Sequence, residues 1–289
     1  MTLYSNTVGV GGVYSDLVTW DAANGGAPTK NLTTDGNSVE ALIIGDVVAG
    51  YPTLDLIGWA ADAINSMTIR ANTGAEFNPT TMTGARLIDQ TSSNFGVVLR
   101  SGGYLFIKNL GITFSNAVND LFYEESAIIA QKCTIYGCTT GVSKHIFINN
   151  SHFSNCIFIL SAPATANNGA GIIFKEVLKN CTIICKLGSG AFNGDIVCRE
   201  SDMTNTVVYN ENTKTSYNSI YSPTSLLTCA QNNNGSSALG AGHVEGITTA
   251  DFTDYANGDY SVAPGSSLID AGTDLSAEFT TDIVGTVRG

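Results

Sequence analysis

Lys179-Asn-Cys-Thr-Ile-Ile184 is one of five similar segments that decide the fold of this chain. The other four are Lys108-Asn-Leu-Gly-Ile-Thr-Phe114, Gln131-Lys-Cys-Thr-Ile-Tyr136, Ser154-Asn-Cys-Ile-Phe-Ile159 and Thr204-Asn-Thr-Val-Val-Tyr209. Their second residues, from Asn109 to Asn205, follow one another at spacings of 23, 23, 25 and 25 residues. Short strands and turns that repeat at this period are typical of a solenoid, in which each coil packs only on its neighbours.

The repeat predicts an all-β fold, a right-handed parallel β-helix with 23–25 residues per coil. Adjacent coils of such a fold are separated by about 4.8 Å, so equivalent residues stand above one another. Cys133, Cys156 and Cys181 share the third position of the repeat. We therefore expect these three cysteines to form a buried, reduced ladder with their Cα atoms about 5 Å apart.

Asparagine dominates the second position of the repeat, at Asn109, Asn155, Asn180 and Asn205. We expect these side chains to stack at the turn before the strand. There an amide can hydrogen-bond to the backbone and to the asparagines of adjacent coils. Lys132 takes this position in the remaining segment and interrupts the ladder.

A helix is predicted in only one place, residues 15–24. Ser15 fits an N-cap, and Leu17, Trp20 and Ala23 fall roughly on one face. The helix is short, so it must pack on something apolar to be stable. Because a solenoid exposes strand edges at both ends, we expect this helix to belong to a cap over the first coil.

The pattern divides the chain into three parts of one domain. Residues 1–39 form the N-terminal cap with its short helix, and residues 40–239 form the coils. Residues 240–289 lose the repeat, and we expect them to form a closing segment at the other end.

The two ends of the chain resemble those of known β-helix proteins. Asp259-Tyr-Ser-Val-Ala-Pro-Gly-Ser-Ser-Leu-Ile-Asp-Ala-Gly272, followed by Asp282-Ile-Val-Gly-Thr-Val-Arg288, resembles the closing segment of pectate-lyase-like right-handed β-helix proteins. Val262 stands where that segment usually has Leu, and Ser267 where it usually has Pro. Val8-Gly-Val-Gly-Gly-Val-Tyr-Ser-Asp-Leu-Val-Thr-Trp20 is similar to the opening of β-helix proteins common in bacteriophage genomes. The resemblance implies the fold but not one function, because lyases, hydrolases, tailspikes and non-catalytic structural proteins all have this fold.

Charge and hydropathy exclude two classes of partner. The chain has 25 acidic and 13 basic residues, for a net charge of −12, so it lacks the basic face that a nucleic-acid-binding protein needs. No stretch is apolar for the roughly 18 residues of a membrane span. The acids concentrate at the two ends: residues 1–69 have seven acids and one base, and residues 215–289 have eight acids and one base. This imbalance favours solubility, or attraction to a basic partner or a cation.

Cysteine usage indicates a reducing compartment. The seven cysteines are an odd number, without a Cys-x-x-Cys pair, and the start of the chain lacks the pattern of a signal peptide. We expect synthesis in a host cytoplasm without secretion, and free thiols packed as small apolar side chains.

The middle coils contain the strongest candidates for catalysis. They are Glu176, Glu200 and Asp202, with Lys175, Lys179 and Arg199 nearby. Glu176 and Glu200 lie about one repeat apart and could stand on adjacent coils, and paired carboxylates can serve hydrolysis or, with Ca²⁺ and a base, lyase chemistry. The alternative is a solvated exterior of mixed charge, which is what we expect.

Other polar groups also fit ordinary structural roles. The three histidines, His145, His152 and His243, have no acid or cysteine at zinc-ligand spacing around them. Oxygen side chains at Asp251, Asp254, Asn257 and Asp259 could attract calcium, but their spacing is not that of an EF-hand. Gly9-Val-Gly-Gly12 lacks the lysine of a phosphate loop, and the glycosylation motifs at Asn31, Asn180 and Asn234 have no meaning without secretion. We expect no catalytic residue, no metal and no cofactor.

Three functional hypotheses remain. The favoured one is a non-catalytic structural protein of a virus particle, a phage capsid decoration or other accessory virion protein. Its partners would be other virion proteins of the capsid or tail, or two further copies in a homotrimer. The alternatives are a tail fibre or tailspike that binds a receptor or surface glycans, and a polysaccharide lyase or hydrolase.

Overall fold

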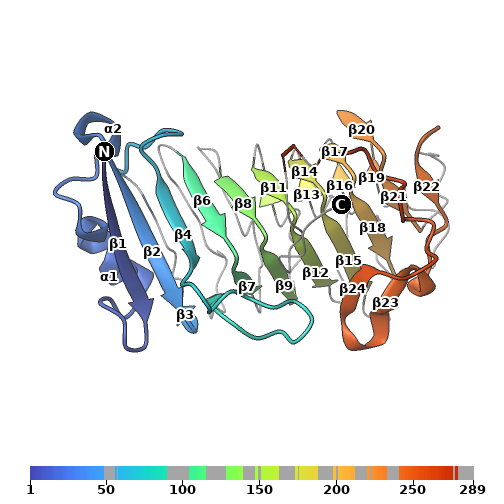
Figure 1. The fold of residues 1–289 in the computed structure, drawn as a ribbon, viewed down its shortest axis with the longest axis horizontal. Coiled ribbons are helices and arrows are strands. Elements are labelled where there is room, and N and C mark those ends of the chain that lie inside the picture. Colours follow the sequence, from blue (N-terminus) through green and yellow to red (C-terminus); the bar gives the residue numbers. More distant parts are fainter. Residues whose placement is uncertain are drawn as a thin grey trace.

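Parallel strands that stack along one axis form a β-solenoid in this computed structural model (Figure 1). The structure describes residues 1–48, 56, 58–89, 104–114, 128–138, 147–148, 151–162, 173–174, 176–187, 198–199, 201–211, 220–221, 223–232, 241–275 and 277–278. The β-helix expected from the repeat is therefore confirmed at the level of a parallel solenoid, whereas its right-handedness stays a prediction.

Two nine-stranded sheets make up most of the described solenoid, and a third sheet of four short strands completes it. Sheet I contains, in spatial order, β1 (Thr2–Gly9), β2 (Asn37–Ile44), β4 (Met67–Ala71), β6 (Leu105–Lys108), β8 (Ile128–Gln131), β11 (His152–Ser154), β14 (Val177–Lys179), β17 (Asp202–Thr204) and β20 (Ser225–Leu227). Sheet II contains β3 (Asp46–Val48), β5 (Arg86–Asp89), β7 (Gly111–Phe114), β9 (Thr134–Cys138), β12 (Ile157–Ala162), β15 (Thr182–Leu187), β18 (Val207–Asn210), β21 (Ala230–Gln231) and β22 (Val244–Glu245). Sheet III contains β10 (Phe147–Ile148), β13 (Ile173–Phe174), β16 (Cys198–Arg199) and β19 (Ile220–Tyr221).

The strand register reproduces the expected coil length in the middle of the chain. Ala130 pairs with Phe153 and Phe153 with Leu178, and these two steps equal the shortest and the longest spacing of the repeat. The first coils are longer, because Ile69 pairs with Ile107 on the next strand of sheet I. Part of this extra length is the segment of residues 72–85, which leaves the solenoid wall between β4 and β5.

The cysteine ladder lies inside the solenoid, as predicted. Cys133, Cys156 and Cys181 are buried and free of disulfides. The amides that follow Cys156 and Cys181 donate to the carbonyl of the preceding cysteine of the ladder, with N–O distances of 2.9 Å from Ile157 to Cys133 and 3.0 Å from Thr182 to Cys156. Burial raises the pKa of the Cys133 and Cys156 thiols well above the ordinary value, which keeps both protonated.

The asparagine ladder occupies a left-handed turn between sheets I and II. All four asparagines have positive φ, between 48° and 58°, as does Lys132. Asparagine tolerates this conformation better than most residues because its short amide can hydrogen-bond locally, which explains its dominance here. Stacking is seen directly where Asn205 Nδ2 donates to Asn180 Oδ1 over 3.0 Å.

The predicted N-terminal helix is present as α1 (Leu17–Ala22), and Leu17 and Trp20 are buried. Two details differ from the prediction. Asp16, not Ser15, is the N-cap, because its carboxylate accepts from Thr19 N at 2.7 Å. Ala23 is the C-cap and is exposed, since the helix ends one residue before it. That the helix caps the first coil stays a prediction.

Two short helical elements follow α1. They are the 3₁₀ turn η1 (Asn24–Gly26) and the helix α2 (Leu32–Asp35), which is too short for a periodic sequence pattern. Trp20 stacks on Trp59 with 5.8 Å between ring centroids, which ties α1 to a residue of a later coil. Trp59 Nε1 in turn donates to Asp21, whose carboxylate also pairs with Lys30.

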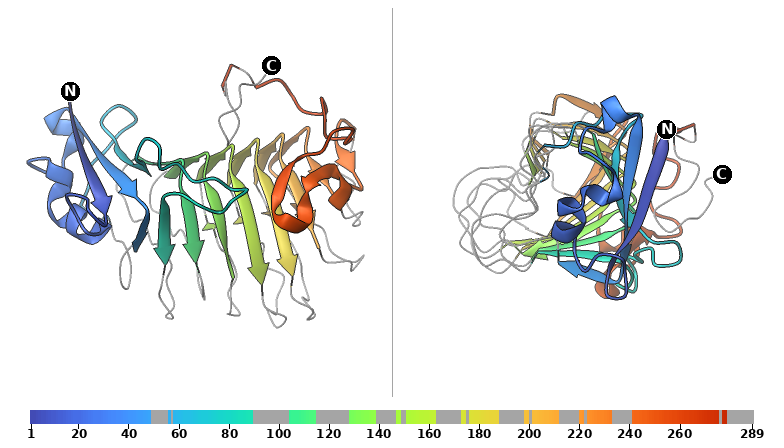
Figure 2. Two further views of the ribbon diagram at one scale, coloured as in Figure 1. Left: turned by 60° about the horizontal axis from the view of Figure 1, so that its bottom comes forward. Right: turned by 90° about the vertical axis from the view of Figure 1, so that its left-hand side faces the viewer.

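After β22 the described chain returns along the outside of the solenoid (Figure 2). It contains η2 (Thr249–Asp251), β23 (Phe252–Asp254), η3 (Tyr255–Asn257) and β24 (Asp259–Val262), with β23 and β24 antiparallel. The domain boundaries expected at residues 39 and 239 stay predictions. No helix among the described residues is both long enough and apolar enough to span a bilayer.

Candidate functional site

The outer face of sheet II is covered by the chain itself. At one end, Phe77 stacks on Tyr136, with 5.9 Å between ring centroids. Phe77 needs a glycine beneath it, because a Cβ on Gly111 would come within 2.6 Å of its ring. Farther along, Phe252 and Tyr260 of the hairpin form an apolar cluster with Ile184. The partly buried side chains packed on this cluster are Ile157, Ile159, Val207, Tyr209 and Tyr255.

Sheet I presents its outer face differently: β2, β4, β6, β8 and β11 face the viewer uncovered in Figure 1. The register places two rows of side chains on this face. The first row contains Phe106, Ile129, His152 and Val177. The second row contains Arg70, Lys108, Gln131, Ser154 and Lys179. We call these two rows together the open face.

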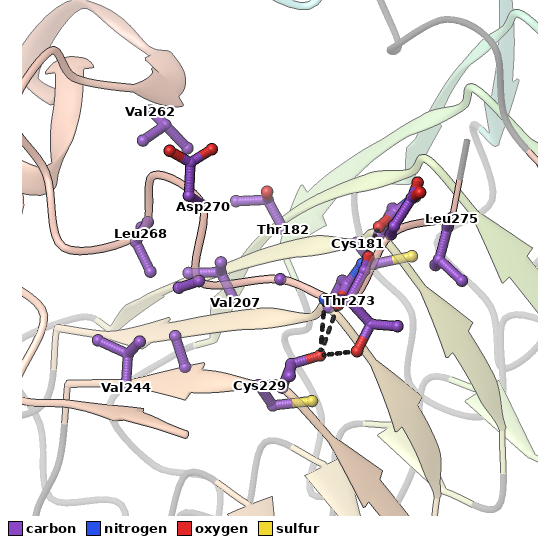
Figure 3. A pocket seen from close by; sticks show the side chains of 17 residues that line it. Cys181, Thr182, Val207, Cys229, Val244, Val262, Leu268, Asp270, Thr273 and Leu275 are labelled. Atoms are coloured by element: carbon purple, nitrogen blue, oxygen red, sulfur yellow. Dashed lines mark hydrogen bonds between the residues drawn. The ribbon is translucent and has the colours of Figure 1, made fainter. Parts of the chain in front are cut away.

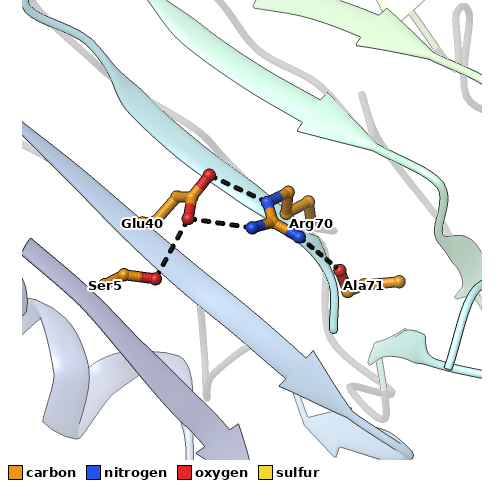
Figure 4. Close-up of polar contacts among 4 residues, drawn as sticks. All are labelled: Ser5, Glu40, Arg70 and Ala71. Carbon is orange, nitrogen blue, oxygen red and sulfur yellow. Dashed lines mark hydrogen bonds and ion pairs between the residues drawn. The ribbon is translucent and has the colours of Figure 1, made fainter. Parts of the chain in front are cut away.

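An ion pair lies at the β4 end of the open face. Arg70 binds Glu40 through two N–O contacts of 2.8 and 3.1 Å, and Ser5 donates to the same carboxylate (Figure 4). Burial acts to raise the pKa of Glu40, but the hydrogen bonds from Arg70 and Ser5 and the charge of Arg70 outweigh it, so the pKa is lowered. Glu40 is therefore ionised at neutral pH, and the pair fixes the Arg70 side chain.

Farther along the open face, the cations lie beside apolar or acidic groups. Lys108 Nζ lies 4.8 Å from the centroid of the Phe106 ring, within the range of a cation–π interaction. Lys179 Nζ pairs with Glu278 at 2.7 Å. Burial and the charge of Lys179 lower the pKa of His152, so this exposed imidazole is mostly neutral at pH 7. The centre of the open face is therefore apolar with a cationic border.

A hollow of about 510 Å³ separates the C-terminal segment from the asparagine ladder (Figure 3). Asn180, Asn205 and Thr228 line one wall, and Leu268 and Asp270 line the other. The chain closes one end of the hollow itself, because Thr273 hydrogen-bonds to both Asn205 and Thr228. The hollow therefore lies between the solenoid and the C-terminal segment that packs on it, and residues of both line it.

Of the two carboxylates expected on adjacent coils, the structure describes Glu176. Val177 pairs with Asp202, a step of 25 residues, and Glu176 N donates to Ser201 Oγ at 3.2 Å. Glu176 is buried, with 1% of its surface exposed, whereas we expected it on a solvated exterior. The repeat in these coils is one residue longer than the separation of the two glutamates in the sequence. Glu200 and Lys175 lie outside the described residues, and Arg199 ends β16.

Asp202 and Lys179 lie on the outward side of sheet I, opposite to the inward side chain of Leu178. Glu176 and Asp202, the two described acids of the cluster, therefore belong to different sides of the wall. This geometry does not form a site with two facing carboxylates.

The remaining candidates are accounted for by local structure. His243 Nδ1 accepts a hydrogen bond from the backbone N–H of Cys229 at 3.1 Å, and His145 lies outside the described residues. Asp251, Asp254 and Asp259 accept hydrogen bonds within their own turns, from Thr248, Asn257 and Ser261 respectively. Within the described part of the chain, no group of three or more acids, histidines and cysteines could hold a metal ion.

The glycine-rich stretch and the glycosylation motifs also have local roles. Gly12 N donates to Gly9 O in a tight turn after β1. Asn31 caps α2 by accepting from Thr34 N, and Asn180 belongs to the asparagine ladder. Asn234 lies outside the described residues.

One feature of the repeat could have predicted the open face from the sequence. The first residues of the five repeat segments are Lys108, Gln131, Ser154, Lys179 and Thr204, all of them polar. They stand on adjacent strands of sheet I. A polar position that precedes the left-handed turn in each of these five segments predicts one continuous polar row on the outside of a solenoid.

None of the family models, curated proteins or solved structures compared with this chain matches it. The fold defines the class, a parallel β-solenoid protein, and function is inferred from the geometry of its surface.

Proposed function

We propose that the protein is a non-catalytic structural component of a virus particle, a phage capsid decoration or other accessory virion protein, which binds its neighbours through the open face. The observation that supports this is the contrast between the two large sheets. Within the described residues, the chain covers the outer face of sheet II with its own segments and leaves the row from Phe106 to Val177 uncovered. The resemblance of the N-terminal segment, up to Trp20, to phage β-helix openings supports the viral setting.

The open face has the composition of an interaction surface. Phe106, Ile129 and Val177 supply a partly buried apolar centre, and Arg70, Lys108 and Lys179 supply a polar border. The backbone beneath them is a hydrogen-bonded parallel sheet, so little conformational entropy is lost when a partner docks. The partners would be capsid or tail proteins, or two further copies of this chain in a homotrimer.

The experiment for this proposal is to locate the protein in particles purified by density gradient. We expect it at a fixed ratio to the major capsid protein, and we expect Ile129→Glu to be lost from particles. Val262→Glu is the control, since Val262 is an exposed apolar residue that lies on the hairpin and not on the open face. Absence of the wild-type chain from particles would contradict the proposal.

Catalysis is tested separately with pectin, alginate and bacterial capsular polysaccharides. We expect neither unsaturated products nor new reducing ends. Turnover that Glu200→Gln abolishes would favour a lyase or hydrolase instead. Glycan binding without turnover would favour a tail fibre or tailspike.

A further inference from the structure

The outer edge of β1 offers backbone groups for hydrogen bonding. Along its inner edge, β1 pairs with β2 over its whole length. On its outer edge, only the end is covered: Tyr14 N donates to Thr7 O at 3.1 Å, and Gly9 N donates to Tyr14 O at 2.9 Å. Since backbone groups of alternate residues point to the same side of a strand, those of Leu3 and Ser5 also face this outer edge. Within the described chain, nothing hydrogen-bonds to the N–H and C=O groups of these two residues.

The sequence of β1 contains none of the features that usually prevent strand addition. Residues Thr2–Gly9 include no charged residue and no proline. Natural edge strands commonly use charges, prolines or bulges to avoid pairing with other chains. Leu3 and Ser5 are also exposed to solvent. The edge is therefore a template on which an extended segment can add as a further strand.

The surroundings of this edge are apolar. Large apolar side chains are exposed at Met1, Leu3, Val10, Val13 and Val18. Residues 9–15 and Thr19 also line a hollow of about 510 Å³ next to the covered end of β1. Figure 2 (right) looks onto this end of the solenoid, with β1 along one side and α1 beside it. A strand added at Leu3 and Ser5 would place side chains beside these apolar groups and remove them from water.

The charge of this end decides what kind of strand fits. The segment that runs from the N-terminus to the end of β3 contains five acids and one base. Asp21, Glu40 and Asp46 pair with Lys30, Arg70 and Arg86. Asp16 and Asp35 have no ion-pair partner in the described chain, and a backbone hydrogen bond from Thr19 lowers the pKa of Asp16 and keeps it ionised. A second copy that paired edge to edge here would bring the same acidic end, with five acids and one base, and would be repelled at this edge.

We propose that the outer edge of β1 binds an extended segment of a partner protein, rich in lysine or arginine and in β-branched apolar residues, by strand addition at Leu3 and Ser5. The backbone hydrogen bonds supply affinity, the exposed apolar groups cover the added side chains, and the acids favour a basic partner. This inference does not depend on the virion assignment, because the edge can bind a segment whether or not the protein is found in particles.

The test uses the full chain and a labelled peptide of sequence Lys-Val-Lys-Val-Thr-Val-Lys-Val with blocked termini. We expect saturable binding by fluorescence anisotropy and at least fivefold slower hydrogen exchange at the Leu3 and Ser5 amides. The same peptide with glutamate in place of lysine should bind at least tenfold more weakly. Absence of binding by the lysine peptide, or equal binding of both peptides, would overturn the proposal.

Ser5→Pro and Ser5→Ala form a matched pair of variants. Both lose the hydrogen bond from Ser5 Oγ to Glu40, but only proline removes the outward N–H, and this change leaves the ladder with β2 intact. We expect Ser5→Pro to weaken peptide binding at least tenfold and Ser5→Ala to change it less than twofold. Equal binding by the two variants would contradict strand addition.

A modified peptide makes the test independent of how well Ser5→Pro folds. Methylation of every backbone nitrogen of the lysine peptide removes its backbone donors on both edges without changing its charge, and we expect binding to wild type to disappear. Retained binding would overturn the proposal. Concentration-dependent self-association that Ser5→Pro abolishes would also overturn it, since the edge would then belong to a second copy.

Discussion

The carboxamide of Asn205 hydrogen-bonds to both backbone groups of Thr273. Asn205 Nδ2 donates to Thr273 O and Thr273 N donates to Asn205 Oδ1, each over 2.7 Å. The amide thus replaces the backbone of a neighbouring strand and fixes the C-terminal segment to the turn of the solenoid. Gly272 packs close to this amide, because a Cβ there would lie 3.2 Å from Asn205 Cγ. One asparagine of the ladder therefore has a second role, which its place in the repeat does not reveal.

Replacement of this asparagine by glycine should release the C-terminal segment. Asn205→Gly keeps the left-handed backbone and removes the hydrogen bonds to Thr273 together with those to Asn180 and Thr228, so we expect a loss of about 1–2 kcal/mol of stability. Hydrogen exchange at the Thr273 amide should become faster, as measured by mass spectrometry or NMR. Asn109→Gly is the control, since Asn109 has the same conformation, with φ 58°, on a distant coil. Equal acceleration at Thr273 in both variants would contradict this role.

Lys132 occupies the left-handed turn without the advantage of an asparagine. Its φ is 53°, and a left-handed conformation costs an ordinary L-residue about 1–2 kcal/mol. We expect Lys132→Asn to stabilise the protein by about 0.5–1 kcal/mol, measured by urea unfolding. Lys132→Gln removes the same charge but has no preference for this conformation. If Lys132→Gln stabilises as much as Lys132→Asn, charge and not backbone conformation is the cause.

The comparison of sequence with structure shows which features the repeat predicts. The cysteine and asparagine positions recur in each coil, so their burial and turn geometry follow from stacking alone. Glu176 is buried and not on the expected exterior, because the step of 25 residues places it beside Ser201, and a shift of one residue moves a side chain to the other face of a strand. The docking of Phe77 and Tyr260 on sheet II could not be predicted, since neither residue belongs to the repeat.

Acid should weaken the fold through Glu40. Its pKa in the folded chain is below the ordinary 4.5, because hydrogen bonds from Arg70 and Ser5 outweigh the effect of burial. A carboxylate whose folded pKa is lowered stabilises the fold above its unfolded pKa and loses this contribution as the pH falls through its folded pKa. We expect Glu40→Gln to cost about 1.5 kcal/mol at pH 7, and the difference from wild type to shrink below pH 4.5. Urea unfolding at pH 7, 5, 4 and 3 checks this, and two parallel profiles would contradict it.

The cysteine ladder provides the most severe test of the register. Cys156 is 1% exposed and lies between the equivalent positions of Cys133 and Cys181, so a carboxylate at this position would be buried without a cation beside it. We expect Cys156→Asp to be destabilised by several kcal/mol or to fail to fold at pH 7, because burying an unpaired charge is costly. Cys156→Ala keeps the site small and apolar and should lose no more than about 1–2 kcal/mol.

Thiol labelling provides an independent measurement on the wild-type chain. Cys133, Cys156 and Cys181 should react with a disulfide reagent at pH 8 only when the protein unfolds, since each thiol is enclosed by the coils on either side. Mass spectrometry of the labelled peptides identifies which cysteines react. Rapid labelling of Cys156 in the folded protein, together with a Cys156→Asp variant as stable as Cys156→Ala, would show that this position faces solvent and that the assigned register is wrong.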